Sequence, residues 1–470
     1  MTMNFYILNI LSANWKNSGI KKIVLFFAVL ISTGLSAQHE QHKHSDSTKS
    51  EESGKDSIQG VNNAGNNDMP PMTHAFSLNL PMTRNASGTG WLPDASPMYG
   101  YMIHEKKWMY MLHGNVFTRY NHQDVFNKGT RGDVEFDVVS WFMLMGQRKL
   151  GKNGLFHFST MLSPDNLFGG NGYPLLFQTG ETWEGQPLVD RQHPHDLFSE
   201  LSVSYAYAIN KNTDAFIYVA YPGEPALGSV AFMHRVSALY GPDAPLTHHW
   251  NDGTHISFGV VTAGVRWKQF KIEASTFTGR EPDENRYNFD KPHLDSYSGK
   301  ISCNPNANWA LEISEGFVKS PESIRPEEDV RRTTASAIFS KRLKEESFIN
   351  ATALWGLNRS HSNEHAALLE AVLVISRFAF YGRYEYVEKS IDELNLETNG
   401  FTHDAIFPIN AFTLGSSYDI LRTKAGRIAL GAQASVYSAD SRLDNLYGKN
   451  PVSAEIFVRI YPPAMGVRQD

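Results

Sequence analysis

The sequence predicts an all-β protein whose strands close into a transmembrane, antiparallel up-and-down barrel of about sixteen strands. Three observations predict this fold. Apolar and small polar residues alternate along many short segments, the connections between these segments alternate in length, and the chain starts with an export signal. Residues i and i+2 of a strand share a face, so each segment would have one apolar and one polar face.

The first 37 residues have the order of a secretory signal peptide. Lys21 and Lys22 precede an apolar run over 23–31, and small residues lead to Ser36 and Ala37. A charged region, a short apolar region and a small-residue cleavage site define such a signal, and the run is too short to span a bilayer. We predict a signal peptide over 1–37, with an extended n-region and cleavage after Ala37.

Residues 38–100 are predicted to be a disordered periplasmic leader. Ser, Lys, Glu, Asn and Gly predominate, and few residues are apolar enough to bury. The leader opens with His39, His42 and His44. One interpretation is loose capture of copper or zinc by imidazole, and the other is a soluble tail without an ion. Thioethers that favour Cu(I) follow at Met69, Met72, Met82 and Met98.

The strands of the barrel domain are predicted within residues 101–470. In the clearest segment, Val203 and Tyr205 lie on the apolar face, and Ser202 and Ser204 lie on the other. A soluble sandwich would expose a charged face, whereas Ser, Thr, Gly and Ala suit a crowded wet lumen. The predicted strands are 106–120, 134–148, 154–162, 196–209, 214–222, 255–267, 269–279, 294–303, 308–319, 331–341, 346–357, 366–377, 379–388, 410–420, 426–437 and 452–461.

The connections alternate between short turns and long loops, as in an outer-membrane barrel with periplasmic turns and extracellular loops. This pattern places the protein in the outer membrane with both termini in the periplasm. Its partners would be outer-membrane lipids and the barrel assembly machinery, and the last strand ends in the aromatic Tyr461. The long loops are 121–133, 163–195, 223–254, 280–293, 320–330, 358–365, 389–409 and 438–451.

Composition excludes several other classes of protein. A net charge of -6 gives no reason to expect nucleic acid as a partner. No run of about 18 apolar residues follows the first forty positions, so a bundle of membrane helices is excluded. Cys303 is the single cysteine, so no internal disulfide forms. A closed barrel is stable without one because every strand edge is paired.

The most distinctive motif is His193-Pro194-His195-Asp196. An extended backbone places both imidazoles on one face, and imidazole with carboxylate suits zinc, copper or iron. The alternative is that these residues cap the junction between loop and strand. A divalent metal or copper is therefore the cofactor class that we consider. The candidate metal ligands are His193, His195, Asp196, His248 and His249.

Charged residues of both signs gather in the loops 163–195, 223–254 and 280–293. Opposed charges at a constriction create a transverse field that selects solutes, although the same charges would also hold a loop together by salt bridges. Arg235 would repel a cation, which favours a hydrogen-bonded plug without a ligand. The candidate pore and solute-binding residues are Arg191, Glu224, His234, Arg235, Arg280, Glu281, Asp283 and Arg286.

These patterns predict a porin-like channel or binding protein for a small solute or metal ion. The alternatives are a surface hydrolase on a barrel scaffold and a structural barrel plugged by its own loops. No Gly-x-Ser-x-Gly or His-Glu-x-x-His motif is present, so we predict no catalytic residue, although Ser163, His193 and Asp165 would form a triad on paper.

The motifs around His193, together with Gly-Glu-Pro at 223–225, Phe-Met-His-Arg at 232–235 and Gly-Arg-Glu-Pro-Asp-Glu-Asn-Arg at 279–286, support a family comparison. Over roughly 100–470 the chain resembles a group of uncharacterised bacterial outer-membrane β-barrel proteins. This group is associated with heavy-metal and cation-efflux neighbourhoods. The resemblance implies a barrel and favours a metal as the solute, and it implies no particular functional residue.

Overall fold

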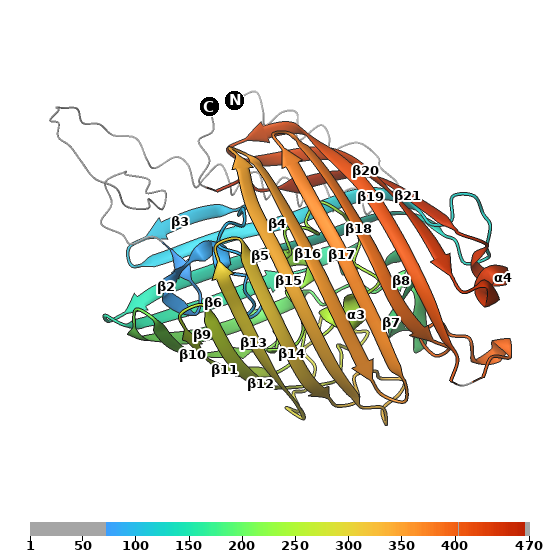
Figure 1. Ribbon diagram of the computed structural model, residues 1–470, viewed down its shortest axis with the longest axis horizontal. Coiled ribbons are helices and arrows are strands. Elements are labelled where there is room, and N and C mark those ends of the chain that lie inside the picture. The colour runs from blue at the N-terminus through green and yellow to red at the C-terminus, as the bar shows by residue number, and fades with distance from the viewer. Residues whose placement is uncertain (1–71, 403, 466–470) are drawn as a thin grey trace, which may run out of the picture. The chain divides into compact units, whose positions relative to one another are not determined.

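The computed structural model describes residues 72–402 and 404–465 (Figure 1). The predicted signal peptide, the leader histidines and Met69 lie outside the described residues. All described residues except 423–425 belong to one compact unit. In this unit, sixteen long antiparallel strands close into a barrel, and β21 pairs with β4 to complete the ring.

The barrel confirms the predicted fold class and all sixteen predicted strands. Its strands are β4 (Trp108–His122), β5 (Val134–Leu150), β6 (Gly154–Leu162), β9 (Phe198–Asn210), β10 (Thr213–Ala220), β11 (Val260–Trp267), β12 (Phe270–Phe277), β13 (Ser296–Asn306), β14 (Trp309–Val318), β15 (Val330–Lys344), β16 (Ser347–Arg359), β17 (Asn363–Ile375), β18 (Phe378–Ser390), β19 (Ile406–Thr423), β20 (Gly426–Ala439) and β21 (Val452–Tyr461). A short strand, β3 (Tyr101–Glu105), pairs with the start of β4.

Two differences from the predicted strands have a common cause. The strand predicted over 255–267 begins only at Val260, because the residues before it belong to a loop that folds inward. The predicted loop 163–195 contains a hairpin, β7 (Tyr173–Trp183) and β8 (Gln186–Gln192), that forms its own two-stranded sheet. The wall passes directly from β6 to β9. Both segments are held by the interior of the barrel and not by the wall.

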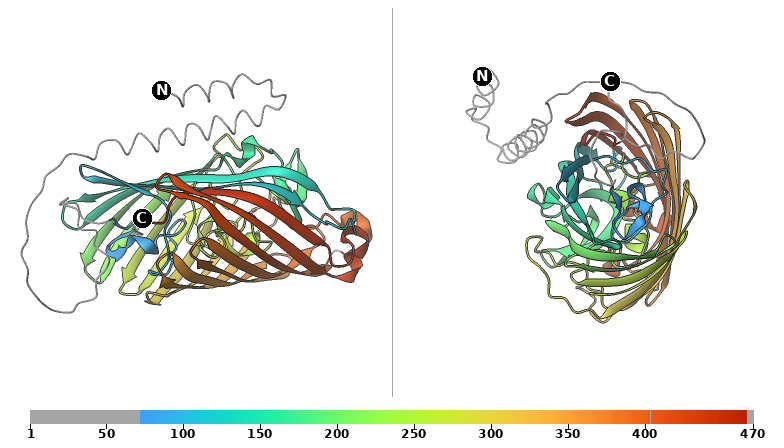
Figure 2. Two further views of the ribbon diagram at one scale, coloured as in Figure 1. Left: turned by 90° about the horizontal axis from the view of Figure 1, so that it is seen from above. Right: turned by 90° about the vertical axis from the view of Figure 1, so that its left-hand side faces the viewer.

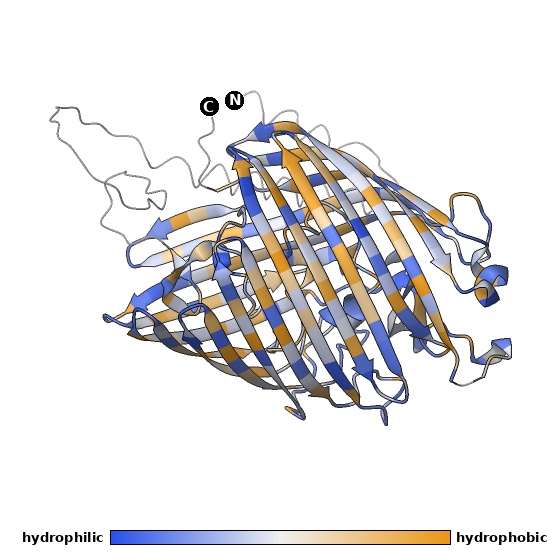
Figure 3. Ribbon diagram, viewed as in Figure 1, coloured by the Kyte–Doolittle hydropathy of each residue, from blue (hydrophilic) through white to orange (hydrophobic). Residues whose placement is uncertain are grey.

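The outer face of the wall is apolar, as the alternation predicts. Val203, Tyr205 and Ile217 are 47, 40 and 45% exposed, whereas Ser202 and Ser204 are buried on the inner face. Apolar positions recur along the outside of the strands in Figure 3. In a bilayer, hydrocarbon covers such a surface, and closure satisfies every strand edge. The protein is therefore a transmembrane barrel of the outer-membrane type.

Within residues 72–402 and 404–465, no helix combines the length and the apolar composition that a membrane-spanning helix requires. The described helices are single turns: η1 (Met82–Arg84), η2 (Pro164–Leu167), η3 (Phe232–His234), α3 (His248–Asn251), η4 (Glu397–Asn399), η5 (Ser441–Leu443) and α4 (Asp444–Tyr447).

The predicted leader boundary at residue 100 differs from the structure, because residues 72–100 are ordered and fill part of the barrel. This N-terminal segment contains β1 (Thr73–His74) and β2 (Ser77–Pro81). The backbone NH of Trp91, which is 1% exposed, donates to Glu312 Oε1 of the wall at 3.1 Å. Asn304 Nδ2 donates to the backbone oxygen of Leu92 at 2.9 Å. The segment buries its few apolar side chains against the barrel, which composition alone did not reveal.

Two long loops also enter the barrel, and Figure 2 shows them with the N-terminal segment inside the ring of strands. Gln178 Nε2, in the hairpin β7–β8, donates to the backbone oxygen of Pro245 in the loop 221–259 at 3.0 Å. Arg119 of the wall lies over the ring of Tyr173 at 4.0 Å and forms ion pairs with Asp137, Asp243 and Glu455. Buried charges need such partners, so the polar wall and the loops stabilise one another.

Candidate metal-binding site

Five buried histidines meet where the two inner loops touch. His193 and His195 follow β8, and His248 and His249 open the short helix α3, with His255 close behind it. Each of the five is at most 8% exposed. The structure thus brings together four of the five predicted metal ligands, and it adds His255, whose place in the sequence gave the only hint.

Three of these imidazoles are arranged to hold one ion. A ring nitrogen from each of His193, His248 and His249 lies within 4.8 Å of the other two. The ring centroids are 5.5 Å apart for His193 and His249, and 5.1 Å apart for His248 and His249. Zinc binds imidazole nitrogen at about 2.0–2.1 Å, so a small inward rotation of the rings would complete a shared site.

The hairpin is shaped to admit one of these rings. Gly180 in β7 has a φ of +121° and lies against His249. A Cβ atom at this position would lie 1.7 Å from Cε1 of the His249 ring. Glycine is therefore required here both for the backbone conformation and for the close approach of the ring.

Oxygen acceptors orient the histidines through one ring nitrogen. His248 Nδ1 lies 2.7 Å from Asp252 Oδ1, and His195 Nδ1 lies 3.2 Å from Asp165 Oδ2. His255 Nδ1 lies 2.9 Å from the backbone oxygen of Asp252. The Nε2 atoms of His195 and His255 are buried without a hydrogen-bond partner. Paired imidazoles with a free second nitrogen are typical of metal sites, because the partner holds the ring in place.

The charge state of the cluster also suits a metal. Burial lowers the pKa of His193, His249 and His255 well below the usual range, and neighbouring cations and histidines lower it further. These rings are neutral at pH 7, and neutral imidazole is the form that binds metals. The donor set therefore fits copper or zinc.

An acidic cavity of about 140 Å³ opens beside His249 at the end of the barrel that carries the long loops. Glu322 and Glu281 in this cavity are buried, and burial raises the pKa of Glu322 to about 7, with Glu393 as the next cause. Arg325 and Arg332 are its two arginines. Its seven carboxylates belong to Glu281, Glu322, Glu328, Glu364, Asp392, Glu393 and Asp404.

The arginines among the candidate pore residues are held by neighbouring groups. Arg191 pairs with Asp133 and Glu135, and Arg280 Nη2 donates to Ser320 Oγ at 2.5 Å. Arg235, with its side chain fully buried, pairs with Asp252 and Glu370. Arg286 pairs with Glu181 and with Asp196, at 3.4 Å in the second case. Asp196 is thus an ion-pair partner in the structure, outside the set of three histidines.

The remaining candidates divide between the surface and the interior. Asp283 is exposed and accepts a hydrogen bond from the backbone NH of Asn285 at 2.7 Å. Glu281 lines the acidic cavity, and Glu224 and His234 line a second, internal cavity. Sequence reasoning missed the other carboxylates of the acidic cavity, such as Glu322 and Glu393. The dense acidic residues of loops 320–330 and 389–409 were the available signal.

The chain matches no protein-family model and no curated protein. Three solved barrels are similar to it. These are OmpF of Salmonella typhi (TM-score 0.46, 9% identity, covering 77% of this chain and 100% of that one), the anion-selective porin of Comamonas acidovorans (0.43, 11%, 76% and 100%) and OmpT of Vibrio cholerae (0.43, 10%, 77% and 99%). The strand order and lipid-facing surface of the chain itself establish a porin-like, sixteen-strand outer-membrane barrel.

Proposed function

We propose that this barrel binds a divalent metal or copper ion at His193, His248 and His249 and passes it across the outer membrane. The proposal takes the end with the long loops as extracellular, as their lengths predict. The observation that carries it is the convergence of three buried ring nitrogens within 4.8 Å of one another. Their position beside the acidic cavity supports entry from that end.

Charge favours a cation over an anionic solute. The acidic cavity has seven carboxylates and two arginines, so its field would concentrate cations at its mouth. The arginines that would attract anions are engaged elsewhere, as with Arg235 and its two carboxylates. The filled interior supports a small ion over a larger solute, because three segments of the chain occupy the lumen.

The hydrolase alternative receives no support from the geometry. Asp165 pairs with His195, not with His193. The Nε2 atom of His195, which would have to activate a serine, has no hydrogen-bond partner. The Ser163 hydroxyl instead accepts a hydrogen bond from Ser199 Oγ at 2.8 Å.

Replacing the three histidines by alanine should abolish the high-affinity site. We expect His193→Ala/His248→Ala/His249→Ala to bind one Zn²⁺ or Cu²⁺ fewer per chain than its parent, because no other described group supplies three converging nitrogens. Equilibrium dialysis with elemental analysis of the refolded protein measures this. Parent and variant both carry glutamine at His39, His42 and His44, so that the leader contributes equally.

The matched control replaces three histidines remote from the site, His104, His293 and His365, by alanine. It should keep the ion that the site variant loses. Equal metal content in the control and the site variant would refute the assignment. Migration of unheated samples in detergent gels checks that both barrels are folded.

Cation uptake should weaken as the pH falls from 8 to 6. Glu322, with a pKa of about 7, is ionised at the upper end of this range and neutral at the lower end, so the acidic cavity loses attraction for cations on acidification. Proton uptake by His193 and His249 falls below this range, because burial lowers their pKa. Proteoliposome uptake of Zn²⁺ measures the effect. Glu322→Gln should be slower at pH 8 and show a flatter profile, and an unaltered profile would exclude Glu322 as the cause.

A further inference from the structure

A second group of soft ligands lies apart from the histidine site. All eleven methionines within the part of the chain that the structure describes belong to one cluster inside the barrel. Seven are buried and four pack partly buried against them. They are Met72, Met82, Met98, Met102, Met109, Met111, Met143, Met145, Met161, Met233 and Met465.

Simple apolar packing does not explain this selection. The inner wall elsewhere carries mainly hydroxyl, amide and charged side chains, whereas here β4 and β5 turn methionines inward in register, with Met111 opposite Met145. The cluster contains no valine or isoleucine and only one leucine, Leu239, among the described residues. Aliphatic residues would bury as much surface, so the thioether sulfur distinguishes the chosen side chain.

The cluster surrounds a cavity of about 80 Å³, which we call the methionine chamber. His113 of β4 and His234 of the inner loop 221–259 also line it, with ring centroids 5.9 Å apart. The Nε2 atom of His113 is buried without a hydrogen-bond partner. Its methionines are Met98, Met111, Met143, Met145 and Met233.

The lining of the methionine chamber selects by charge and by softness. It includes no aspartate or glutamate, and its one charged residue is Arg459. The Arg459 guanidinium donates to Asn115 Oδ1 and lies 3.8 Å from the Tyr461 ring centroid. Without an anion, a doubly charged ion would be costly to bury, and a single charge costs less. Thioethers and imidazole are the donors that Cu(I) prefers.

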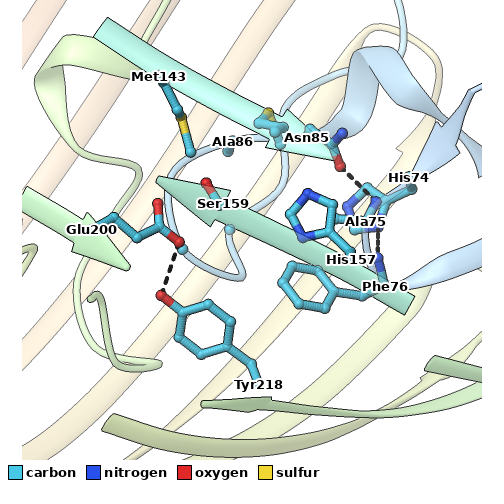
Figure 4. A pocket seen from close by; sticks show the side chains of 13 residues that line it. His74, Ala75, Phe76, Asn85, Ala86, Met143, His157, Ser159, Glu200 and Tyr218 are labelled. Carbon is cyan, nitrogen blue, oxygen red and sulfur yellow. Dashed lines mark hydrogen bonds between the residues drawn. The ribbon is translucent and has the colours of Figure 1, made fainter. Parts of the chain in front are cut away.

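Small internal cavities connect the methionine chamber with the rest of the interior. One of about 20 Å³ is lined by Met233 and His234, which also line the chamber, and by His255 of the histidine cluster. Another, of about 10 Å³, includes Met143 and Met145 of the chamber. Figure 4 shows this second cavity, with Met143 opposite Glu200 and with His157 further along. An ion in the chamber would therefore have ligand-type neighbours on both sides.

We propose that the methionine chamber is a binding site for a soft monovalent cation, Cu(I), that is separate from the histidine site. Thioethers of Met111, Met143, Met145 and Met233 and the imidazoles of His113 and His234 are its donors. The proposal does not depend on the function proposed above, because the two sites share no residue.

Ag(I), a redox-stable analogue of Cu(I), tests this on the purified full-length chain. The variant Met143→Leu/Met145→Leu/Met233→Leu keeps side-chain volume and removes three sulfurs. The matched control, Met82→Leu/Met102→Leu/Met109→Leu, changes the same cluster outside the chamber lining. We expect the chamber variant to bind one Ag(I) fewer per chain than the control, with loss of silver–sulfur scattering in X-ray absorption.

Two further measurements make the result decisive. The three-histidine variant should bind Ag(I) in the chamber as the parent does, which separates this proposal from the histidine site. If the triple chamber variant does not fold, the single variant Met145→Leu should bind Ag(I) about tenfold more weakly or worse than Met109→Leu. Equal Ag(I) binding by chamber and control variants, or bound silver without sulfur scattering, would overturn the proposal.

Discussion

Excision of the hairpin β7–β8 should convert the filled barrel into an open pore. The hairpin contributes Phe177, which is 0% exposed, and packs with residues on the inner faces of β17 to β20. It belongs to its own two-stranded sheet, so its removal leaves every wall pairing intact. In planar bilayers, we expect the variant to show large ohmic steps where the parent shows small ones or none.

The chain offers a natural junction for this excision. A Cβ atom on Gly172 would lie 3.0 Å from the Cα atom of His193, so residues 173–192 can be removed and the ends joined without a linker. The control is Glu184→Ser at the exposed tip, which leaves the hairpin in place. Equal conductance of the excised and control proteins would show that the remaining segments close the pore by themselves. That result would favour a plugged structural barrel over passage of an ion.

Replacing Arg235 by methionine should strongly destabilise the protein. The buried guanidinium donates from Nε to Glu370 Oε1 at 2.8 Å and from Nη1 to Asp252 Oδ2 and to the backbone oxygen of Val230, both at 2.9 Å. Its removal leaves two buried carboxylates without their cation, which costs about 3–5 kcal/mol. The urea midpoint of unfolding, followed by the mobility shift of unheated samples, should fall accordingly.

The comparison for this prediction is an exposed ion pair. Arg442, with a side chain that is 45% exposed, pairs with Asp440, and Arg442→Met should change stability by about 0–1 kcal/mol. Adding Glu370→Gln to Arg235→Met should recover part of the loss, because one unpaired charge is removed. Equal midpoints for the two arginine variants would disprove the role of Arg235 as the anchor of the inner loop. Since Asp252 also holds His248, zinc affinity should fall together with stability.

Much of the barrel was predictable from the sequence because its rules are local. Alternation such as that of Val203 and Ser204 assigns each residue to the lipid or the lumen within a few positions, and the turn lengths order the strands. The convergence of His193 with His248 was not predictable, since it depends on a loop contact across 55 positions of the chain. Polar loops that fold inward and polar loops that stay outside have the same composition, so Arg235 gave no sign of its buried partners.

The sequence by itself determined the strands, their outward faces and the ligand types available, because strand period and side-chain chemistry are properties of neighbouring residues. Only the tertiary structure decided what fills the lumen. It placed residues 72–100 inside the barrel, separated the histidine cluster from the methionine chamber and paired each buried arginine with its carboxylates. Those outcomes depend on contacts between distant segments, where burial of charge and closeness of packing select one arrangement among many.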